Sequence, residues 1–552
     1  MSDRIEASEV CLTPRSGRWE KVTSFLQKHR RPVSAVLFGL LMFIALIGFW
    51  NQPWFSSDEA EIFMHGQAIA QGELLYAETG SQHMPLMYYL AALFSLLGAR
   101  TITGFRIWFY LFTAVLWGIM FYRYQKRWGK LALCLYPLLY ICLLSHLDWT
   151  ATCVLSDQYQ GIGMAILLFE FLEFNEERRL SIPASCMISL AIFISFGSAF
   201  VAAFGVFVIV CAVLLLDIWD RILAKEGFWK SVLGFLKQFW QVVLIVAAPF
   251  ALLFLYYLVT GTLDDFINWA YLLNRTVYVN YTGGYGNSIL SGFFGGYVHY
   301  LGLFTFSPLT ARAAFGLFLI FCSVGLLLLV ARRGKGMGIR LVGLVLFLVA
   351  CATRGLLDFH GVPALAVLCA MSACFLGRVL DPSAIKKNFV RMTALAFALV
   401  LMVTPYLCKA VPAWVKLPFA NDKPENSTAW CLDTITEEGE RVGFGILFCD
   451  IMVLAGVHPA TVQGGSVPWF WDYAGEETMR ELRSDPPRAY LYSPEHEVWG
   501  HKITEYAPEL ASFMDENYTS LSALGQPLVW VHNDYFEEAQ NKILTARGEL
   551  AP

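Results

Sequence analysis

A few acidic and basic side chains stand at the ends of long apolar runs, and their types suit acid–base chemistry beside a phosphate group. Asp58 and Glu59 follow the first apolar run, and Asp157 stands at the start of a later one. A carboxylate in such a place can take the proton from an attacking hydroxyl group. Arginine and histidine can stabilise a phosphate that gains negative charge. The candidates for that second role are His83, Arg106, Arg275, Arg354 and His360.

Each of these residues also has a purely structural interpretation. Asp58 could cap the helix that follows it, and Asp157 could do the same for its own helix. His83 and His360 could be interface residues without chemistry. Glu61 and His65 are spaced to share one helix face, so they could form a simple pair or help to hold a metal ion. The chemistry requires no cofactor, because arginine and histidine can stabilise the phosphate, although a divalent ion could assist.

Membrane-spanning helices are the elements that must position these side chains. The chain has 552 residues, of which 57% are hydrophobic and only 15% are charged, whereas soluble domains carry about 25% charged residues. No basic tract or zinc-type Cys/His spacing suggests a nucleic-acid partner. Apolar runs near the length that crosses a bilayer, about 20 residues, predict spans at 33–50, 105–122, 131–147, 158–174, 181–197, 199–216, 239–260, 311–331, 339–353, 361–377 and 389–409.

The distribution of basic residues orients these spans. If residues 1–32 are cytoplasmic, 25 of the 40 Lys and Arg residues fall on the inner side, as the positive-inside rule requires. The long segments 51–104 and 261–310 then lie outside. The apolar segment 84–98 is too short to span, so we expect an interfacial or re-entrant helix there. A further helix or hairpin within 289–310 could raise the number of spans from about eleven to thirteen.

The last part of the chain, 412–552, has a different character from the membrane domain at 33–411. It is charged, and short strand-like runs alternate with helix-like ones, which predicts a small α/β domain on the extracytoplasmic side. Cys431 and Cys449 lie in this domain and could pair if that side is oxidising. The fold class is therefore an α-helical polytopic membrane protein with a C-terminal extracytoplasmic α/β domain.

The motifs of the first outer segment, in their order, resemble those of the GT-C glycosyltransferases. The resemblance is closest to the glycosyltransferase family 39-like group. This group contains the protein O-mannosyltransferases and the lipid A aminoarabinose transferase. It rests on Asp58-Glu59, the Gly72 to Tyr76 turn, and the run His83-Met84-Pro85-Leu86-Met87-Tyr88-Tyr89-Leu90, in which Met84 replaces the first proline that the family often has. Weaker matches are Arg106, Ser156-Asp157 and Asp358 to Pro363, the last with departures from the family pattern.

The resemblance implies an inverting transfer of a hexosyl or pentosyl group from a polyprenyl-phosphate sugar to a lipid, glycan or protein acceptor. The reaction would take place on the outer face of a bacterial inner (plasma) membrane, in lipopolysaccharide or protein glycosylation of the cell envelope. Asp58 would be the base or would position the acceptor, with Glu59 beside it and Asp157 as the second acid. His83, together with Arg106, Arg275, Arg354 or His360, would contact the donor phosphate.

Two other functions are compatible with the sequence. A transporter or lipid flippase would place polar groups near the bilayer midplane, and here they gather at one face. An inactive relative of the same fold that only binds a lipid or a partner protein is the other alternative.

Overall fold

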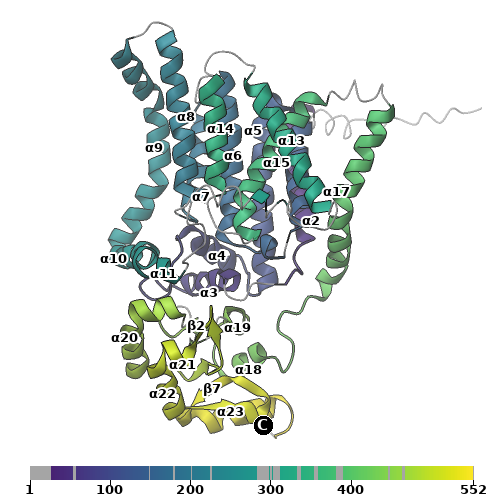
Figure 1. Cartoon of the computed structure of the whole chain (residues 1–552). Coiled ribbons are helices and arrows are strands. Elements are labelled where there is room, and N and C mark those ends of the chain that lie inside the picture. The colour runs from purple at the N-terminus through teal and green to yellow at the C-terminus, as the bar shows by residue number, and fades with distance from the viewer. Residues whose placement is uncertain are drawn as a thin grey trace, which may run out of the picture.

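The computed structural model describes residues 27–53, 58–147, 149–177, 181–199, 202–223, 227–281, 297–298, 301, 311–331, 337–352, 358–380, 389–445, 448–462 and 467–550. A helical bundle forms one end of the molecule and a small α/β domain forms the other (Figure 1). Two short helices, α3 (Asp58–Ala70) and α4 (Leu86–Leu96), lie between them. The segments predicted to be outside therefore occupy the junction between bundle and domain.

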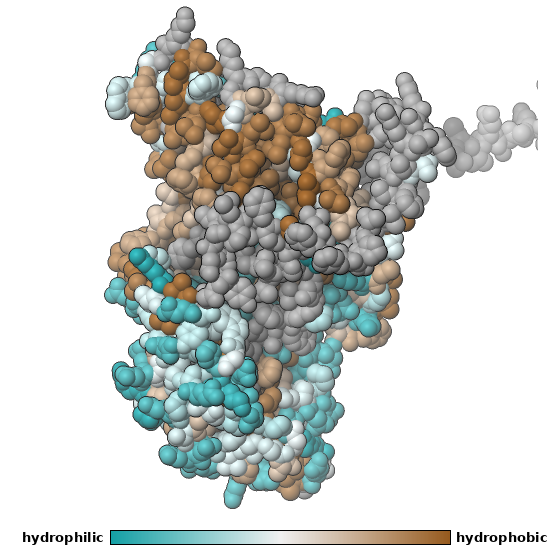
Figure 2. All heavy atoms as spheres, in the orientation of Figure 1, coloured by the Kyte–Doolittle hydropathy of each residue, from teal (hydrophilic) through white to brown (hydrophobic). Residues whose placement is uncertain are grey.

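Every predicted span coincides with a helix of the bundle. Within the described residues, six helices are long and apolar enough to cross a membrane. Apolar side chains cover the visible bundle surface, whereas polar side chains cover the α/β domain (Figure 2). The chain is thus a multi-pass membrane protein, and a total of about eleven spans stays a prediction. The bundle helices are α2 (Arg30–Ile47), α5 (Ile102–Leu144), α6 (Ser156–Glu177), α7 (Ile182–Phe196), α8 (Ala202–Leu223), α9 (Phe228–Thr260), α13 (Ala311–Ala331), α14 (Met337–Cys351), α15 (Val362–Val379) and α17 (Phe389–Lys416).

The longest helix, α5, folds back on itself at Gly129. This residue has φ 80° and ψ 157°, which interrupts the helical backbone. The ring centroids of Trp117 and Tyr136 are 6.2 Å apart, whereas in a straight α-helix the two Cα atoms would be about 28 Å apart. The two arms therefore run side by side, and they match the two spans predicted at 105–122 and 131–147. The positive φ explains why a glycine stands at this turn.

The first outer segment folds as a pair of short helices instead of a span. The α4 helix has 11 residues, which gives about 16 Å of length, against a hydrocarbon core of about 30 Å. Its size agrees with the interfacial or re-entrant helix predicted for 84–98. It packs closely on α3 at Gly66, where an added Cβ would stand 2.4 Å from the Cβ of Ala91.

The described part of the second outer segment is helical, which the sequence did not predict. It comprises α10 (Leu263–Phe266), the π-helical turns η2 (Ile267–Leu272) and η3 (Asn274–Tyr278), and α11 (Val279–Tyr281). The π-helix is rare and occurs frequently at functional sites. The further helix that 289–310 could hold falls almost wholly outside the described residues.

The C-terminal part contains the predicted α/β domain. Its five-stranded sheet has the order β2-β1-β3-β7-β6, in which β1 pairs in parallel with β2 and β3, and β7 pairs antiparallel with β3 and β6. Cys431 and Cys449 are buried free thiols, so they do not pair. The strands are β1 (Arg441–Phe444), β2 (His458–Pro459), β3 (Ala489–Leu491), β6 (Tyr518–Leu521) and β7 (Gln526–His532), with a separate hairpin of β4 (Glu497–Val498) and β5 (His501–Lys502).

Helices cover this sheet and join it to the rest of the molecule. They are α18 (Thr428–Ile435), α19 (Cys449–Ala455), α20 (Pro468–Ser484), α21 (Ile503–Tyr506), α22 (Pro508–Asn517) and α23 (Phe536–Ala546). Of these, α19 packs on α3 and α20 packs on η3, so both outer segments of the membrane domain touch the α/β domain.

Candidate active site

The first turn of α3 carries the candidate acids at the junction of bundle and domain. Asp58 begins the helix and is partly exposed, whereas Glu59 is fully buried. The carboxylate of Glu59 accepts hydrogen bonds from Arg106 Nε at 2.8 Å and Arg106 Nη2 at 2.5 Å. It also accepts one from the backbone N–H of Val154 at 2.9 Å. Glu59 therefore ties α3 to α5 and to the segment that precedes α6.

Arg106 occupies a different environment from the phosphate site expected for it. Its side chain is fully buried, and its remaining donors point at backbone carbonyls: Nη1 at Trp50 (3.0 Å) and Gln52 (2.6 Å), and Nη2 at Pro53 (3.3 Å). A guanidinium enclosed by a carboxylate and three carbonyls has its hydrogen-bonding capacity satisfied by the protein itself. In this structure Arg106 fixes the segment that follows α2 against α3, and phosphate binding by Arg106 stays a prediction.

Asp157 lies close to this ion pair. It stands in the first turn of α6, 1% exposed, and accepts a hydrogen bond from Ser156 Oγ at 3.3 Å. Because Glu59 holds the backbone of Val154 just before it, the two acidic motifs are anchored to each other. The turn η4 (Asp358–Gly361), which contains His360, packs on α6 and on the turn η1 (Trp149–Thr152). The structure thus brings the segments of Asp58, Asp157 and His360 together.

His83 and Arg275 lie on neighbouring segments. The hydroxyl of Tyr76 donates to the carbonyl of His83 at 2.6 Å, and Asn274 Nδ2 donates to the carbonyl of Gln82 at 2.6 Å. Arg275, next to Asn274, is exposed, and its Nη1 donates to the hydroxyl of Tyr271 at 2.8 Å. Of the remaining phosphate candidates, Arg354 lies outside the described residues.

The Gly72 to Tyr76 turn has a structural purpose that the motif alone did not reveal. Tyr76 is fully buried and has φ 72°, a conformation that a bulky residue rarely adopts. Its ring packs 5.5 Å from that of Phe266 in α10. Tyr76 therefore links the His83 segment to the second outer segment, which explains why an aromatic residue with a hydroxyl stands there.

Glu61 and His65, the weak metal candidates, form a buried pair on α3. Glu61 Oε1 lies 3.7 Å from His65 Nε2, and His65 Nδ1 lies 2.6 Å from Thr79 Oγ1. The ring of Tyr88 meets His65 edge-on at 5.5 Å. Among the described residues, no group of three His, Cys, Asp or Glu side chains is arranged to hold a metal ion. The structure instead shows Thr79 and Glu61 orienting the ring of His65.

The α/β domain covers the start of α3 through α19. Helix α19 begins at Cys449, a buried thiol whose pKa is raised well above its ordinary value by burial and then by the nearby carboxylates of Glu61, Asp450 and Asp58. Beyond it, His458 Nδ1 lies 2.9 Å from Glu73 Oε1. Sequence reasoning missed this contact between the domain and the Gly72 to Tyr76 turn, because no local signal marks which residues of two distant segments will meet.

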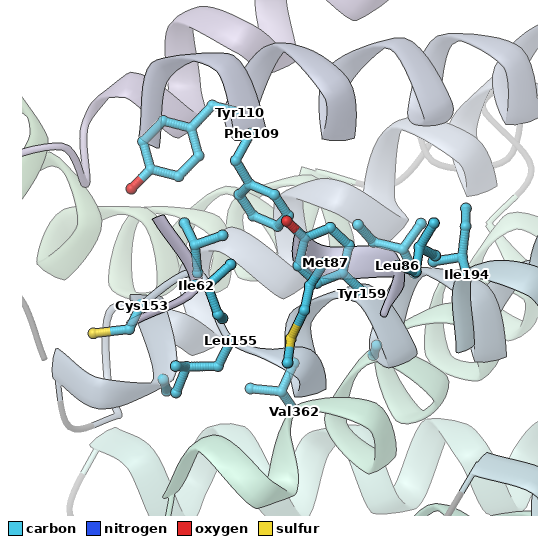
Figure 3. Close-up of a cluster of buried hydrophobic side chains, with 14 of the residues drawn as sticks. Ile62, Leu86, Met87, Phe109, Tyr110, Cys153, Leu155, Tyr159, Ile194 and Val362 are labelled. Carbon is cyan, nitrogen blue, oxygen red and sulfur yellow. The ribbon is translucent and has the colours of Figure 1, made fainter. Parts of the chain in front are cut away.

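An apolar layer lies beneath these polar groups. Figure 3 shows Ile62 of α3, Met87 of α4, Tyr159 of α6 and Val362 of α15 meeting in one cluster. All four are buried. A charged group near such a layer interacts more strongly with its neighbours than it would in water, because little solvent screens it.

Comparison with known proteins identifies the fold. No protein-family model matches the chain, and no curated protein sequence matches it. The crystal structure of ArnT from Cupriavidus metallidurans bound to undecaprenyl phosphate aligns with a TM-score of 0.50 and 16% sequence identity, over 81% of this chain and 88% of that one. An Archaeoglobus fulgidus oligosaccharyltransferase structure tethered with an acceptor peptide aligns with a TM-score of 0.44 and 12% identity, over 90% of this chain and 73% of that one. The alignment with ArnT shows that this chain has the GT-C fold that its outer-loop motifs predicted.

Proposed function

We propose that this protein is an inverting glycosyltransferase that moves a sugar from a polyprenyl-phosphate donor to a lipid, glycan or protein acceptor. One observation carries the proposal: Asp58 begins α3 at the junction where the segments of Asp157 and His360 also lie. The fold supports it, since the ArnT structure that this chain resembles holds undecaprenyl phosphate.

The reaction assigns each group a task. The hydroxyl oxygen of the acceptor forms a bond to the anomeric carbon of the donor sugar, and its proton passes to Asp58. The bond between that carbon and the phosphate oxygen breaks, and the polyprenyl phosphate leaves with the electron pair. His83, Arg275 and His360 stabilise the negative charge of the departing phosphate. Asp157 orients the acceptor or the donor sugar.

Glu59 and Arg106 act on the chemistry only through position in this proposal. Their buried ion pair fixes the start of α3, and a carboxylate must lie within about 3 Å of the proton that it removes. A bound metal ion is not required, because three cationic or titratable groups already serve the leaving phosphate. Turnover that persists after dialysis against EDTA would support this point, and turnover restored only by added Mg²⁺ or Zn²⁺ would contradict it.

The proposed location follows from the same orientation. With residues 1–32 in the cytoplasm, α3 and the α/β domain lie on the outer side of the cell inner membrane. Proteolysis of inside-out and right-side-out vesicles would test this, since only the right-side-out ones should expose the α/β domain to protease.

The decisive test compares the wild type with Asp58→Asn in proteoliposomes. A panel of radiolabelled undecaprenyl-phosphate sugars serves as donor, and sugar release is measured at matched amounts of folded protein. Loss of a general base should lower the rate on the order of 10²-fold or more. Asp264→Asn, which alters an exposed acid of α10, is the matched control and should retain full activity. Equal turnover in wild type and Asp58→Asn would remove Asp58 from the chemistry.

A further inference from the structure

The hairpin of β4 and β5 places a tryptophan where the backbone disfavours it. Val498 pairs with His501, so the turn consists of Trp499 and Gly500 alone. Both have positive φ, 51° and 86°. Two-residue hairpins with two positive φ angles prefer Asn-Gly or Asp-Gly, and a bulky residue in this region is an outlier. Strained residues of this kind cluster at functional sites, so the position of Trp499 calls for a functional explanation.

The strain holds an exposed ring in a defined place. Trp499 is 53% exposed, yet its ring centroid lies 4.7 Å from that of Trp469 in α20 and 6.1 Å from that of Tyr278 in η3. The rings of Tyr278 and Trp469 lie 5.2 Å apart. The ring of Tyr281 in α11 lies 5.9 Å from that of Trp469. Three segments that are distant in sequence thus combine into one set of rings, which we call the aromatic platform: Tyr278, Tyr281, Trp469 and Trp499.

Polar groups surround this platform. The hydroxyl of Tyr281 donates a hydrogen bond to Asp472, and the Tyr281 ring lies 5.7 Å from that of His501. The Nε1–H of Trp469 is buried and meets no acceptor within the described part of the chain. Buried donors nearly always have a partner. The indole N–H of Trp469 lies among the rings of the platform but is itself covered by the protein.

We propose that the aromatic platform is a saccharide-binding site. A pyranose ring has an apolar face of C–H groups and a rim of hydroxyl groups. The face packs on an aromatic ring, and the hydroxyls need donors and acceptors around that ring. Trp499 supplies the exposed ring surface, with the partly exposed rings of Tyr278 and Tyr281 beside it, and Trp469 supports them from below. Asp472 and His501 supply the polar rim.

The platform adjoins the candidate active site through η3. Helix α20 packs on η3, the turn that contains Asn274 and Arg275, and α11 and α20 lie next to each other at the junction (Figure 1). A saccharide on the platform would therefore be part of a glycan-bearing acceptor held beside the transfer site. The inference that the platform binds a saccharide does not depend on the proposed transfer. Only the assignment of that saccharide to the acceptor rests on the proposed function.

A membrane surface is the rival ligand, because tryptophan and tyrosine also gather at bilayer interfaces. The immediate neighbours of Trp499 favour the saccharide. The strands on either side of it carry Glu497, His501 and Lys502, all of which are exposed. Charged side chains on both arms of the hairpin suit a hydrated glycan better than an acyl-chain boundary.

The test uses full-length protein in nanodiscs on a microarray of defined oligosaccharides. We expect the wild type to bind a subset of the array and Trp499→Ala to bind that subset at least tenfold more weakly. Trp499→Phe, which keeps an aromatic ring, should recover most of the affinity. Trp229→Ala removes another exposed tryptophan, in α9, and should bind as the wild type does. Absence of binding to every saccharide, or equal binding by Trp499→Ala, would overturn the proposal.

A second measurement separates glycan from membrane. In protein containing 5-fluorotryptophan, the fluorine resonance missing from Trp499→Phe belongs to Trp499. A shift of this resonance with the array-selected oligosaccharide supports the platform. Broadening by nitroxide-labelled lipid headgroups without any such shift would overturn it in favour of a membrane anchor. Because these readouts need no turnover, failure of the proposed transferase reaction would leave them unaffected.

Discussion

Replacing Glu59 by glutamine should destabilise the protein strongly, because the substitution leaves a buried charge without its partner. The Arg106 guanidinium is fully buried, and two of its nitrogens donate to the Glu59 carboxylate at 2.8 and 2.5 Å. Glutamine keeps the volume, but it removes the negative charge and turns an N–H group toward the guanidinium. Removal of one member of a buried ion pair costs about 3–5 kcal/mol.

The double variant Glu59→Met/Arg106→Met gives a second expected change in the free energy of unfolding. It removes both charges, which by itself is often neutral or stabilising. Here the carbonyls of Trp50, Gln52 and Pro53 also lose their donor. The bond to Trp50 is buried, and a buried unsatisfied group costs about 1–3 kcal/mol. We therefore expect the double variant to remain less stable than the wild type, with a coupling energy of about 1–3 kcal/mol between the two positions.

The assay is equilibrium unfolding in mixed micelles, followed by tryptophan fluorescence. Glu438→Gln breaks the exposed contact of that residue with Arg100 (3.5 Å) and serves as the control, since exposed ion pairs contribute little. If Glu59→Gln unfolds like the wild type and loses only turnover, Glu59 takes part in the chemistry and our positioning argument is wrong.

Three further predictions follow from single residues. Trp499→Asn should raise the melting temperature, because asparagine tolerates positive φ; a lower value by differential scanning fluorimetry would mean that the turn is not strained. Gly66→Ala should destabilise by about 1–3 kcal/mol, because its Cβ would stand 2.4 Å from that of Ala91; an unchanged unfolding midpoint would contradict the close packing of α3 on α4. Cys449 should resist N-ethylmaleimide at pH 8, because its raised pKa keeps the buried thiol neutral and only the thiolate reacts. The raised pKa also makes a contribution to the free energy of unfolding. That contribution is fully present below the pKa of an unfolded thiol and is lost as the pH rises through the folded pKa. Peptide mapping that finds Cys449 modified before unfolding would contradict this.

Hydrophobic length predicted the positions of the membrane helices, whereas the orientation derived from charge asymmetry stays a prediction. The positions of the spans follow from apolar runs, which report directly on burial in lipid. The tight turn in α5 coincides with the basic segment that the positive-inside rule placed in the cytoplasm, and α4 has the short length expected for 84–98. These properties are local, so a single sequence contains them.

The contacts that build the site are not local, and the sequence left them open. Charge reasoning placed Arg106 at the outer boundary, but it could not show whether the side chain faces a ligand or Glu59. The π-helical turns from Ile267 to Tyr278 lie in a segment for which the sequence predicted an outer location but no secondary structure. The contact between Cys449 and the acids of α3 joins segments at opposite ends of the chain, and no periodicity or motif reports on such a pairing.

The packing of α19 on α3 also constrains how the protein is made. The first outer helix leaves the ribosome long before α19 does, and every intervening span must insert before the two can meet. The acids of α3 therefore acquire the cover of α19 only after the last domain has folded. In the proposed orientation that domain must first be exported, so an unfinished chain would present α3 uncovered to the proteases and chaperones outside the membrane.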